Sequence, residues 1–327
     1  MKKLLLIILL LGIGGVGGCT AHKLLSEKDN QKVQITHNPK EIKDHLRYLE
    51  SSLDSLHHLK PNPIPGEWLF HNRELRQYPH QFLEAHPSIL DEDKQKIYIQ
   101  PIGSFTPMQT DILTKTAAYL TVFYHVPVEI LDSVSAAEVP SHARRKNNFG
   151  NEQLQTTYIM NKILQPNVPK DGRAVMGFTA YDLYPNDDYN FVFGQGRIGG
   201  EVGIYSIARF GYPDWDSTEY SMVMQRTFKV ASHELGHIFG FRHCVDYECL
   251  MNGSNHMDET DRKPFYLCPL DLLKVTQGMG IDEIYRFQKL ADFWRELGYS
   301  EQEEFYLECI RLLESSKNRK EGGIHNN

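Results

Sequence analysis

Apolar residues in the central part of the chain follow two alternating spacings, one typical of strands and one typical of helices. The continuous apolar run at 96–102 predicts a buried strand, and residues 107–124 carry apolar side chains at helical steps behind Pro107. The same criteria predict further strands at 126–131, 173–183, 189–193 and 201–210, and further helices at 151–164, 220–241, 269–278, 282–297 and 300–316. The pattern therefore predicts mixed strands and helices from about residue 96 onward.

The segment before this region is organised differently. Residues 40–59 place isoleucine and leucine side chains at three- and four-residue steps, which predicts one helix with a single apolar face. Prolines beginning at Pro61 end this helix. His57 and His58 lie near its end, and we expect both on the surface.

The first nineteen residues have the organisation of an export signal. Lys2 and Lys3 precede an uncharged apolar run at 4–16, which is shorter than the roughly 20 residues that a membrane-spanning helix needs. The run ends in small residues and Cys19, which resembles a bacterial lipobox. That resemblance implies cleavage before Cys19 and a lipid on the cysteine, which becomes the first residue of the mature chain. An ordinary secretory peptide cut near Gly18 is the alternative.

The residues after Cys19 indicate where such a chain is held. Polar residues at 20–40 are suited to a tether between a membrane and the folded domain. Thr20 stands where inner-membrane lipoproteins of Gram-negative bacteria carry aspartate, so the usual sorting convention favours the outer membrane. The prediction is an exported lipoprotein that is anchored to the membrane through Cys19.

Composition and charge narrow the class of protein. Hydrophobic residues make up 41% of the chain and charged residues 24%, which is enough to build a real core. The formal charge is −7, because 35 basic residues face 42 acidic ones. A mildly acidic chain argues against nucleic acid as the main partner, since phosphate binding needs a basic face. Five cysteines in 327 residues are too few for a disulfide-dense scaffold.

The strongest chemical signal is the sequence HELGHIFGFRH at 233–243, which has the pattern HExxHxxGxxH. His233 and His237 are four residues apart on the predicted helix, so their imidazoles share one face and can hold one zinc ion. Glu234 lies beside them and can take a proton from water on the metal. The spacing therefore predicts a zinc site with a base next to it.

The residues that follow complete the motif. Gly240 can adopt a positive φ, and the resulting turn lets His243 approach as a third ligand. Three protein ligands leave one position for water, as catalytic zinc sites do. The alternative is a core helix that happens to carry two histidines. It explains neither Gly240 nor His243.

A methionine follows the zinc motif at a characteristic distance. Met251 comes eight residues after His243, within Cys249-Leu250-Met251-Asn252. A zinc helix followed in this way by a methionine turn resembles the metzincins. By that resemblance the Met251 side chain forms an apolar floor beneath the three histidines. Taken alone, it is an ordinary core methionine.

Cysteines around this turn form a second pattern. Cys244 follows the third histidine, Cys249 comes five residues later, and Cys268 begins the sequence Cys268-Pro269-Leu270-Asp271. This arrangement resembles the archaemetzincins, in which four cysteines hold a second, structural zinc. Here the fourth position is Asp271, whose carboxylate can also bind zinc.

Other ligands and other chemistry remain open for these cysteines. Cys309 and His256 are alternative candidates for the fourth ligand of the second zinc. Disulfides are a further alternative, since an exported location permits them: Cys244 with Cys249, and Cys268 with Cys309.

The resemblance to archaemetzincins extends over about 63–280. Its upstream parts are Pro65-Gly66-Glu67-Trp68-Leu69 and the segments 175–185, 190–194 and 199–210. It implies an α+β, metzincin-like domain in which a mixed, twisted sheet packs on helices around a long active-site helix. Together with the signal segment, the predicted organisation is a signal peptide at 1–18, a tether and helix at 19–60, the catalytic domain at 61–280, C-terminal helices at 281–316 and a disordered tail at 317–327.

The same resemblance implies a function. The expected activity is that of a zinc metallopeptidase acting on a peptide or protein, with one catalytic zinc and a second structural one. An edge strand of the sheet would pair with the extended substrate, and residues 201–210 are our candidate for that strand. The alternative is a membrane-anchored binding or assembly factor that keeps zinc for stability without turnover. The intact Glu234 favours an enzyme.

One motif is set aside. Residues 194–199 spell GxGxxG after a predicted strand. A dinucleotide site needs a helix directly afterwards, whereas another strand-like segment follows here. We therefore interpret these glycines as a connection beside an edge strand.

Overall fold

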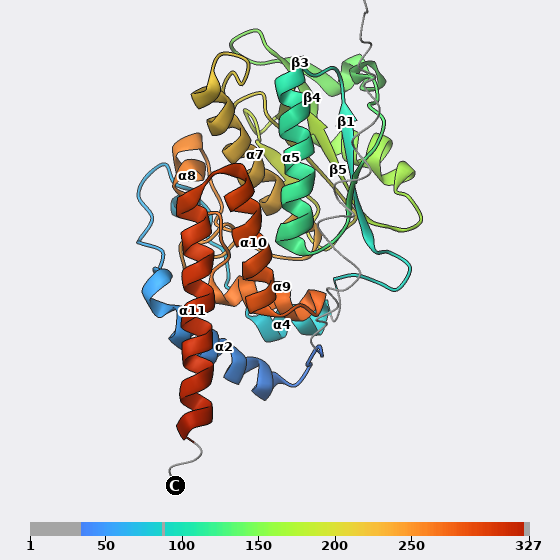
Figure 1. Ribbon diagram of the computed structural model, residues 1–327. Coiled ribbons are helices and arrows are strands. Elements are labelled where there is room, and N and C mark those ends of the chain that lie inside the picture. Colours follow the sequence, from blue (N-terminus) through green and yellow to red (C-terminus); the bar gives the residue numbers. More distant parts are fainter. Residues whose placement is uncertain (1–33, 87–88, 324–327) are drawn as a thin grey trace, which may run out of the picture.

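The computed structural model describes residues 34–86 and 89–323 (Figure 1). The predicted signal peptide and Cys19 lie outside the described residues. Within the described ranges, none of the helices combines the length and the apolar character needed to cross a membrane.

A five-stranded sheet forms the centre of the molecule. Its order is β2 (Val128–Ile130), β1 (Lys96–Ile102), β5 (Gly172–Thr179), β8 (Val202–Ser206) and β7 (Gly194–Gly196). The first four strands are parallel, with Ile97 paired with Val128 and with Ala174. β7 is antiparallel to β8, with Gly196 opposite Gly203, and forms one edge of the sheet.

Helices cover both faces of this sheet because its strands are apolar on both sides. α5 (Pro107–Tyr124) and α7 (Ser217–Ile238) lie against one face, where they bury Ile97 and Ile99 (Figure 1). Tyr98, which points the other way, packs with a separate cluster that includes the π-helix Ile159–Leu164. The mixed sheet packed on helices confirms the predicted α+β class.

A smaller sheet stands beside the first. Its strands are β3 (Arg144–Lys146), β4 (Glu152–Gln155) and β6 (Asp182–Tyr184), with β4 antiparallel to β3 and parallel to β6. Short helical turns connect these parts, at Ala136–Glu138, Ser141–Ala143, Thr156–Tyr158 (α6) and Gln165–Asn167.

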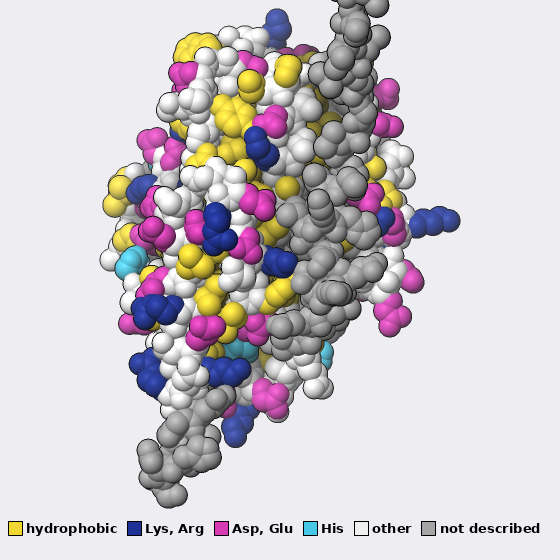
Figure 2. All heavy atoms as spheres, viewed as in Figure 1, with side chains coloured by type: hydrophobic (Ala, Val, Ile, Leu, Met, Phe, Trp, Pro, Cys, Tyr) yellow, Lys and Arg dark blue, Asp and Glu magenta, His cyan; other side chains and the backbone are white. Residues whose placement is uncertain are grey.

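The remaining helices come from the N-terminal and C-terminal parts of the described chain. They are α2 (Pro39–Leu53), a 3-10 turn at Asp54–Leu56, α3 (Trp68–His71), α4 (Pro79–Ala85), α8 (Met257–Arg262), α9 (Pro269–Met279), α10 (Glu283–Leu297) and α11 (Ser300–Gly323). Among them, α2 packs against α9 and α11. In Figure 1, α11 lies along α10 and reaches α2 at the N-terminal side. Figure 2 shows acidic and basic side chains interspersed over this face.

Several predicted elements match the structure and others were wrong. The strand at 96–102 and the helix at 107–124 are confirmed to the residue. The helix predicted at 151–164 begins instead with β4, because Glu152–Gln155 pairs with strands on both sides. The strand predicted at 173–183 is two strands, β5 and β6, separated by a bend at 180–181.

Three further predictions need correction. Residues 189–193 form no strand, and the edge strand is β7, whose glycines lack the side chains that mark strands. His57 is buried rather than exposed, because its ring packs edge-on against Tyr266 and Phe305. The last helix continues to Gly323, past the tail boundary at 317, because the residues before Gly322 are compatible with helix.

Candidate active site and second metal site

The long helix α7 carries the first part of the site. The Asp216 carboxylate caps its start by accepting hydrogen bonds from the N–H groups of Thr218 and Glu219, at 2.8 and 2.9 Å. The helix ends at Ile238, and Gly240, with φ of 98°, turns the chain back. The turn directs the following residues toward the histidines of the helix.

The three histidines converge as the motif predicts. Nε2 of His237 lies 3.1 Å from Nε2 of His233 and 3.2 Å from Nε2 of His243. Ligands at about 2.0–2.1 Å from a tetrahedral zinc lie about 3.3 Å apart, so the three nitrogens fit one ion. The geometry supports the prediction that these three nitrogens bind zinc.

Each imidazole is fixed by its other nitrogen. Nδ1 lies 3.0 Å from the Leu250 carbonyl oxygen in His233 and 2.7 Å from the Phe241 carbonyl oxygen in His237. Because a carbonyl only accepts, both Nδ1 atoms carry the proton and both Nε2 atoms present a lone pair. Burial lowers the pKa of His237 to about 3, so that imidazole is neutral, as a metal ligand must be.

The third histidine has an acidic partner that the sequence did not reveal. The Glu74 carboxylate lies 2.8 and 2.9 Å from Nδ1 of His243. Burial opposes ionisation of Glu74, but its hydrogen bond to His243 keeps its pKa below the usual range. The two residues are 169 positions apart, and no local spacing connects them.

The Pro65–Leu69 segment also reaches the site. The Trp68 ring meets His243 edge-on, with centroids 5.2 Å apart. Its backbone N–H donates to the buried Glu259 carboxylate. This segment therefore forms the wall beside the third histidine.

Glu234 lies under the edge strand of the sheet. Its side chain is 8% exposed, and a Cβ at Gly194 would come within 2.7 Å of its Cγ. Burial raises the pKa of Glu234 to about 7, against the opposing effects of Lys263 and a hydrogen bond from the Gly196 N–H. A carboxyl group with such a pKa can exchange protons near neutral pH.

The glycine-rich segment at 194–199 is part of this contact. A Cβ at Gly196 would collide with the Glu234 carbonyl oxygen and lie 2.9 Å from Cβ of His237. The glycines thus let β7 approach the helix. The interpretation of these glycines as a connection beside an edge strand was wrong for Gly194–Gly196, which form the edge strand itself. The expectation that 201–210 borders the cleft was wrong, because β8 lies between β5 and β7.

The cleft that results has a volume of about 660 Å³. One side is β7, and the floor includes His233, Glu234 and His237. The lining also includes residues from the segment after Met251 and from the N-terminal segment: Ser254, Asn255, Lys263, Trp68, Glu74 and Leu75.

Met251 lies below the histidines. It is fully buried, and its sulfur would come within 2.7 Å of a Cβ at Gly236, between the first two histidines of the helix. Its position under the helix is consistent with the apolar floor that the metzincin resemblance implies.

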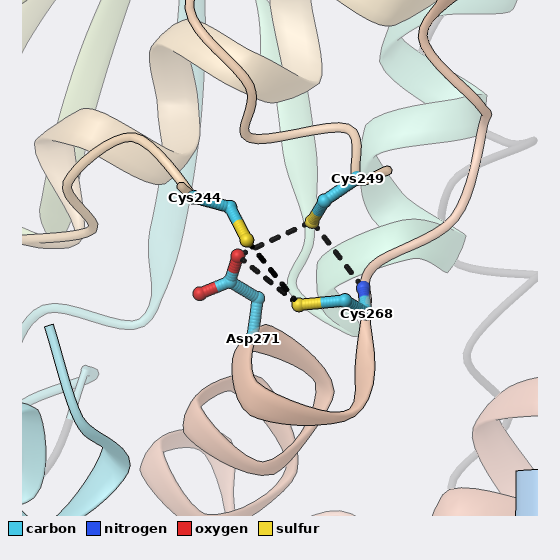
Figure 3. Close-up of side chains that lie close together, drawn as sticks. All are labelled: Cys244, Cys249, Cys268 and Asp271. Carbon is cyan, nitrogen blue, oxygen red and sulfur yellow. Dashed lines mark hydrogen bonds between the residues drawn. The ribbon is translucent and has the colours of Figure 1, made fainter. Parts of the chain in front are cut away.

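The predicted second site is also brought together (Figure 3). Sγ of Cys244 lies 3.6 Å from Sγ of Cys268, and Oδ2 of Asp271 lies 3.2 Å from Sγ of Cys249 and 3.8 Å from Sγ of Cys268. Sulfur ligands at about 2.3 Å from a tetrahedral zinc lie about 3.8 Å apart, so these residues fit one ion.

The structure shows neither the alternative disulfides nor the alternative fourth ligands for these cysteines. Cys244, Cys249, Cys268 and Cys309 are all unpaired and buried. Among the described residues that group as a metal site, Asp271 joins the three cysteines, whereas Cys309 and His256 do not. His256 instead caps α8 by accepting from the Glu259 N–H.

Asp271 has a partner of opposite charge. Its Oδ1 accepts from Nζ of Lys274 at 2.7 Å, and both side chains are at most 3% exposed. The ion pair leaves Oδ2 directed toward the sulfur atoms. Lys274 therefore fixes the orientation of the Asp271 carboxylate.

Comparisons with known proteins show which proteins this chain is similar to. A model of peptidase family M54 matches residues 154–277. Archaemetzincin-2 of Macaca fascicularis is 33% identical over 69% of this chain and 71% of its own, and human archaemetzincin-2 is 34% identical over the same shares. The solved archaemetzincin of Archaeoglobus fulgidus, in complex with malonate, is 30% identical and covers 53% of this chain and 95% of its own, with a TM-score of 0.42.

Proposed function

Because the chain belongs to the archaemetzincin family, peptidase family M54, and is a zinc metallopeptidase, we propose that His233, His237 and His243 hold its catalytic zinc and that Glu234 is its base. The observation that carries this assignment is the convergence of three Nε2 atoms whose rings are fixed through Nδ1. Nothing in the described chain lies between these atoms and the cleft.

The chain's own groups suit amide hydrolysis. Zinc at this position supplies a Lewis acid that polarises a carbonyl and activates water. Glu234 takes the proton of the attacking water and gives it to the leaving amine, and its raised pKa suits both transfers. Glu74 holds His243 in place through the hydrogen bond to Nδ1.

The edge strand β7 suits the binding of an extended peptide. The Phe193 carbonyl and the Arg197 N–H bond to β8. Because antiparallel strands alternate, the backbone groups of Gly194 and Gly196 point away from β8, and of these the Gly196 N–H is used by Glu234. A substrate strand pairs with this edge and crosses the histidines, which is β-augmentation.

We assign Cys244, Cys249, Cys268 and Asp271 to a second, structural zinc. The site is buried and joins the turn after His243 to the start of α9. With four protein ligands it has no open position for water, so it stabilises the fold rather than reacting.

The test replaces Glu234 with Gln and assays zinc-loaded protein on a peptide pool. We expect cleavage to fall by at least about a hundredfold, while zinc content stays unchanged. Glu84→Gln, the same change at an exposed position, is the matched control. Undiminished cleavage by Glu234→Gln would remove Glu234 as the base.

The ligand assignment is tested by His237→Ala, with the exposed His58→Ala as control. The first variant should lose one of two zinc ions and all peptidase activity. Full retention of both ions rejects the ligand set. A wild-type protein that keeps two zinc ions and cleaves no peptide supports the alternative of a binding or assembly factor.

We also propose that the chain is exported and held at a membrane through a lipid on Cys19. The support is the sequence alone: two lysines, an apolar run at 4–16 and small residues before the cysteine. Replacement of Cys19 by Ala should release the protein from the membrane fraction. Unchanged membrane association would reject the lipid anchor.

A further inference from the structure

A buried lysine lines the cleft near Glu234. Lys263 is 6% exposed and lines the cleft with Val230, Glu234, Ser254 and Asn255. Its Nζ donates to the Asn252 carbonyl oxygen at 3.1 Å. An ammonium group has three donors, so two are left over for a ligand.

No carboxylate in the described chain forms an ion pair with Lys263. The Glu259 carboxylate is already used by the backbone N–H groups of Trp68 and Asn255. Glu234 is close enough to interact electrostatically with Lys263, and Lys60 and Lys229 add positive charge around it. A buried cation without an ion-pair partner is costly, which suggests that a ligand supplies the missing charge.

The other polar groups of this part of the cleft are engaged. The Ser254 hydroxyl lies 2.8 Å from the Thr260 hydroxyl, and the Asn255 amide donates to the Gly66 carbonyl oxygen. Val230 adds an apolar wall one helical turn before Glu234. Beside Glu234 the cleft therefore offers an apolar side and, at Lys263, an ammonium group that has donors to spare among the described residues.

The chemistry of the cleft fixes which part of a substrate reaches this pocket. Glu234 must approach the leaving amine to protonate it, so the residue that carries this amine lies on the Glu234 side of the histidines. Lys263 lines the same cleft and is close enough to Glu234 to interact with it electrostatically. The side chain directly after the scissile bond is thus the one that extends toward Lys263.

We propose that Lys263 is a specificity-determining residue that binds the carboxylate of an Asp or Glu directly after the scissile bond. This inference rests on the proposed function. A side-chain carboxylate fits better than a terminal one, because the substrate backbone is taken up by β7 in the proposed function, whereas Lys263 comes from a different segment, at the end of α8.

The test compares peptides that differ only at the residue after the scissile bond, with mass spectrometry to locate the cut. For zinc-loaded wild type, kcat/KM should be about tenfold or more higher with Glu than with Gln. Lys263→Met should bring this ratio to about one, Lys263→Arg should retain much of it, and the exposed Lys43→Met should leave it unchanged. Peptides with acid and amide C-termini separate a side-chain carboxylate from a terminal one.

Binding provides a second readout that does not need turnover. In zinc-loaded Glu234→Gln protein, calorimetry should show about tenfold tighter binding of the Glu peptide than of the Gln peptide, and added Lys263→Met should remove the difference. A wild type that cleaves without acidic preference, or a preference that survives Lys263→Met, overturns this inference and leaves the proposed function intact. Absence of cleavage with all peptides rejects the proposed function. In that case the comparison of Glu and Gln peptide binding still tests whether Lys263 binds a carboxylate.

Discussion

At the scale of single residues, the site depends on groups that orient the histidines as much as on the histidines themselves. Carbonyl oxygens fix His233 and His237: that of Leu250, seven residues after the motif, and that of Phe241, within the motif itself. His243 follows the helix and relies instead on a side chain, Glu74. The third ligand is therefore the one whose position is most sensitive to a single substitution.

We predict that Glu74→Gln weakens binding of the catalytic zinc by about ten- to a hundredfold, since partners of ligating histidines have effects of this size. Competition with a chromogenic chelator measures the affinity. Glu84→Gln, at an exposed position, should leave it unchanged. An unaltered zinc affinity in Glu74→Gln would show that His243 needs no such support.

His57 makes the stability of the protein depend on pH. Burial lowers its pKa to about 4, and among the described residues neither ring nitrogen has a hydrogen-bond partner. In the unfolded chain His57 takes up a proton near pH 6.5, whereas in the folded chain it does so only near pH 4. Between these two pH values the proton is bound only by the unfolded chain, so the protein has its full stability above pH 6.5 and loses stability as the pH falls toward 4. The full loss is about 3 kcal/mol.

His57→Phe keeps the aromatic contacts and removes the titration. Urea unfolding at pH 7, 5.5 and 4 should show a smaller loss of stability for His57→Phe than for wild type. His58→Phe, at the exposed neighbouring position, should follow the wild type. Equal pH dependence in all three proteins would contradict the role of His57.

At the scale of elements, the decisive contact is between the strand β7 and the helix α7. The strand runs across the helix at the level of Glu234, where only glycine fits.

We predict that Gly196→Ala pushes β7 off the helix. It should lower kcat/KM by more than tenfold and the free energy of unfolding by about 1–3 kcal/mol. Peptide cleavage measures the first effect and urea unfolding measures the second. Wild-type activity in Gly196→Ala would show that this close approach is dispensable.

The same elements show what could be predicted from the sequence. Both histidines of the helix and Glu234 follow from spacing, because positions four apart on a helix share a face wherever the helix lies. The pattern of cysteines and Asp271 likewise predicted a group that the structure brings together. Glu74, Lys263 and β7 were missed, because their contacts depend on tertiary packing and the glycines of β7 carry no side chains to form a pattern.

At the scale of the whole molecule, the second site connects the active-site turn to the helical part of the chain. Cys244 directly follows His243, whereas Cys268 and Asp271 begin α9, which packs against α2 and α4. Loss of this site should therefore loosen the third histidine as well as the fold.

Asp271→Ala should lower the zinc content from two ions to one and reduce the melting temperature, because it also leaves Lys274 buried without its partner. Double replacement by Asp271→Ala and Lys274→Met separates the two causes: it should recover part of the stability but none of the zinc. Metal analysis and thermal unfolding provide the readouts. Two zinc ions in both variants would show that Asp271 is not a ligand.

Diffraction at the zinc absorption edge from crystals of the zinc-loaded protein tests the central claim most directly. The account predicts an anomalous peak at about 2.0–2.1 Å from the Nε2 atoms of His233, His237 and His243, with its remaining position open to the cleft. The absence of a peak there, or a zinc ion whose fourth coordination position is filled by a protein atom, would contradict the account.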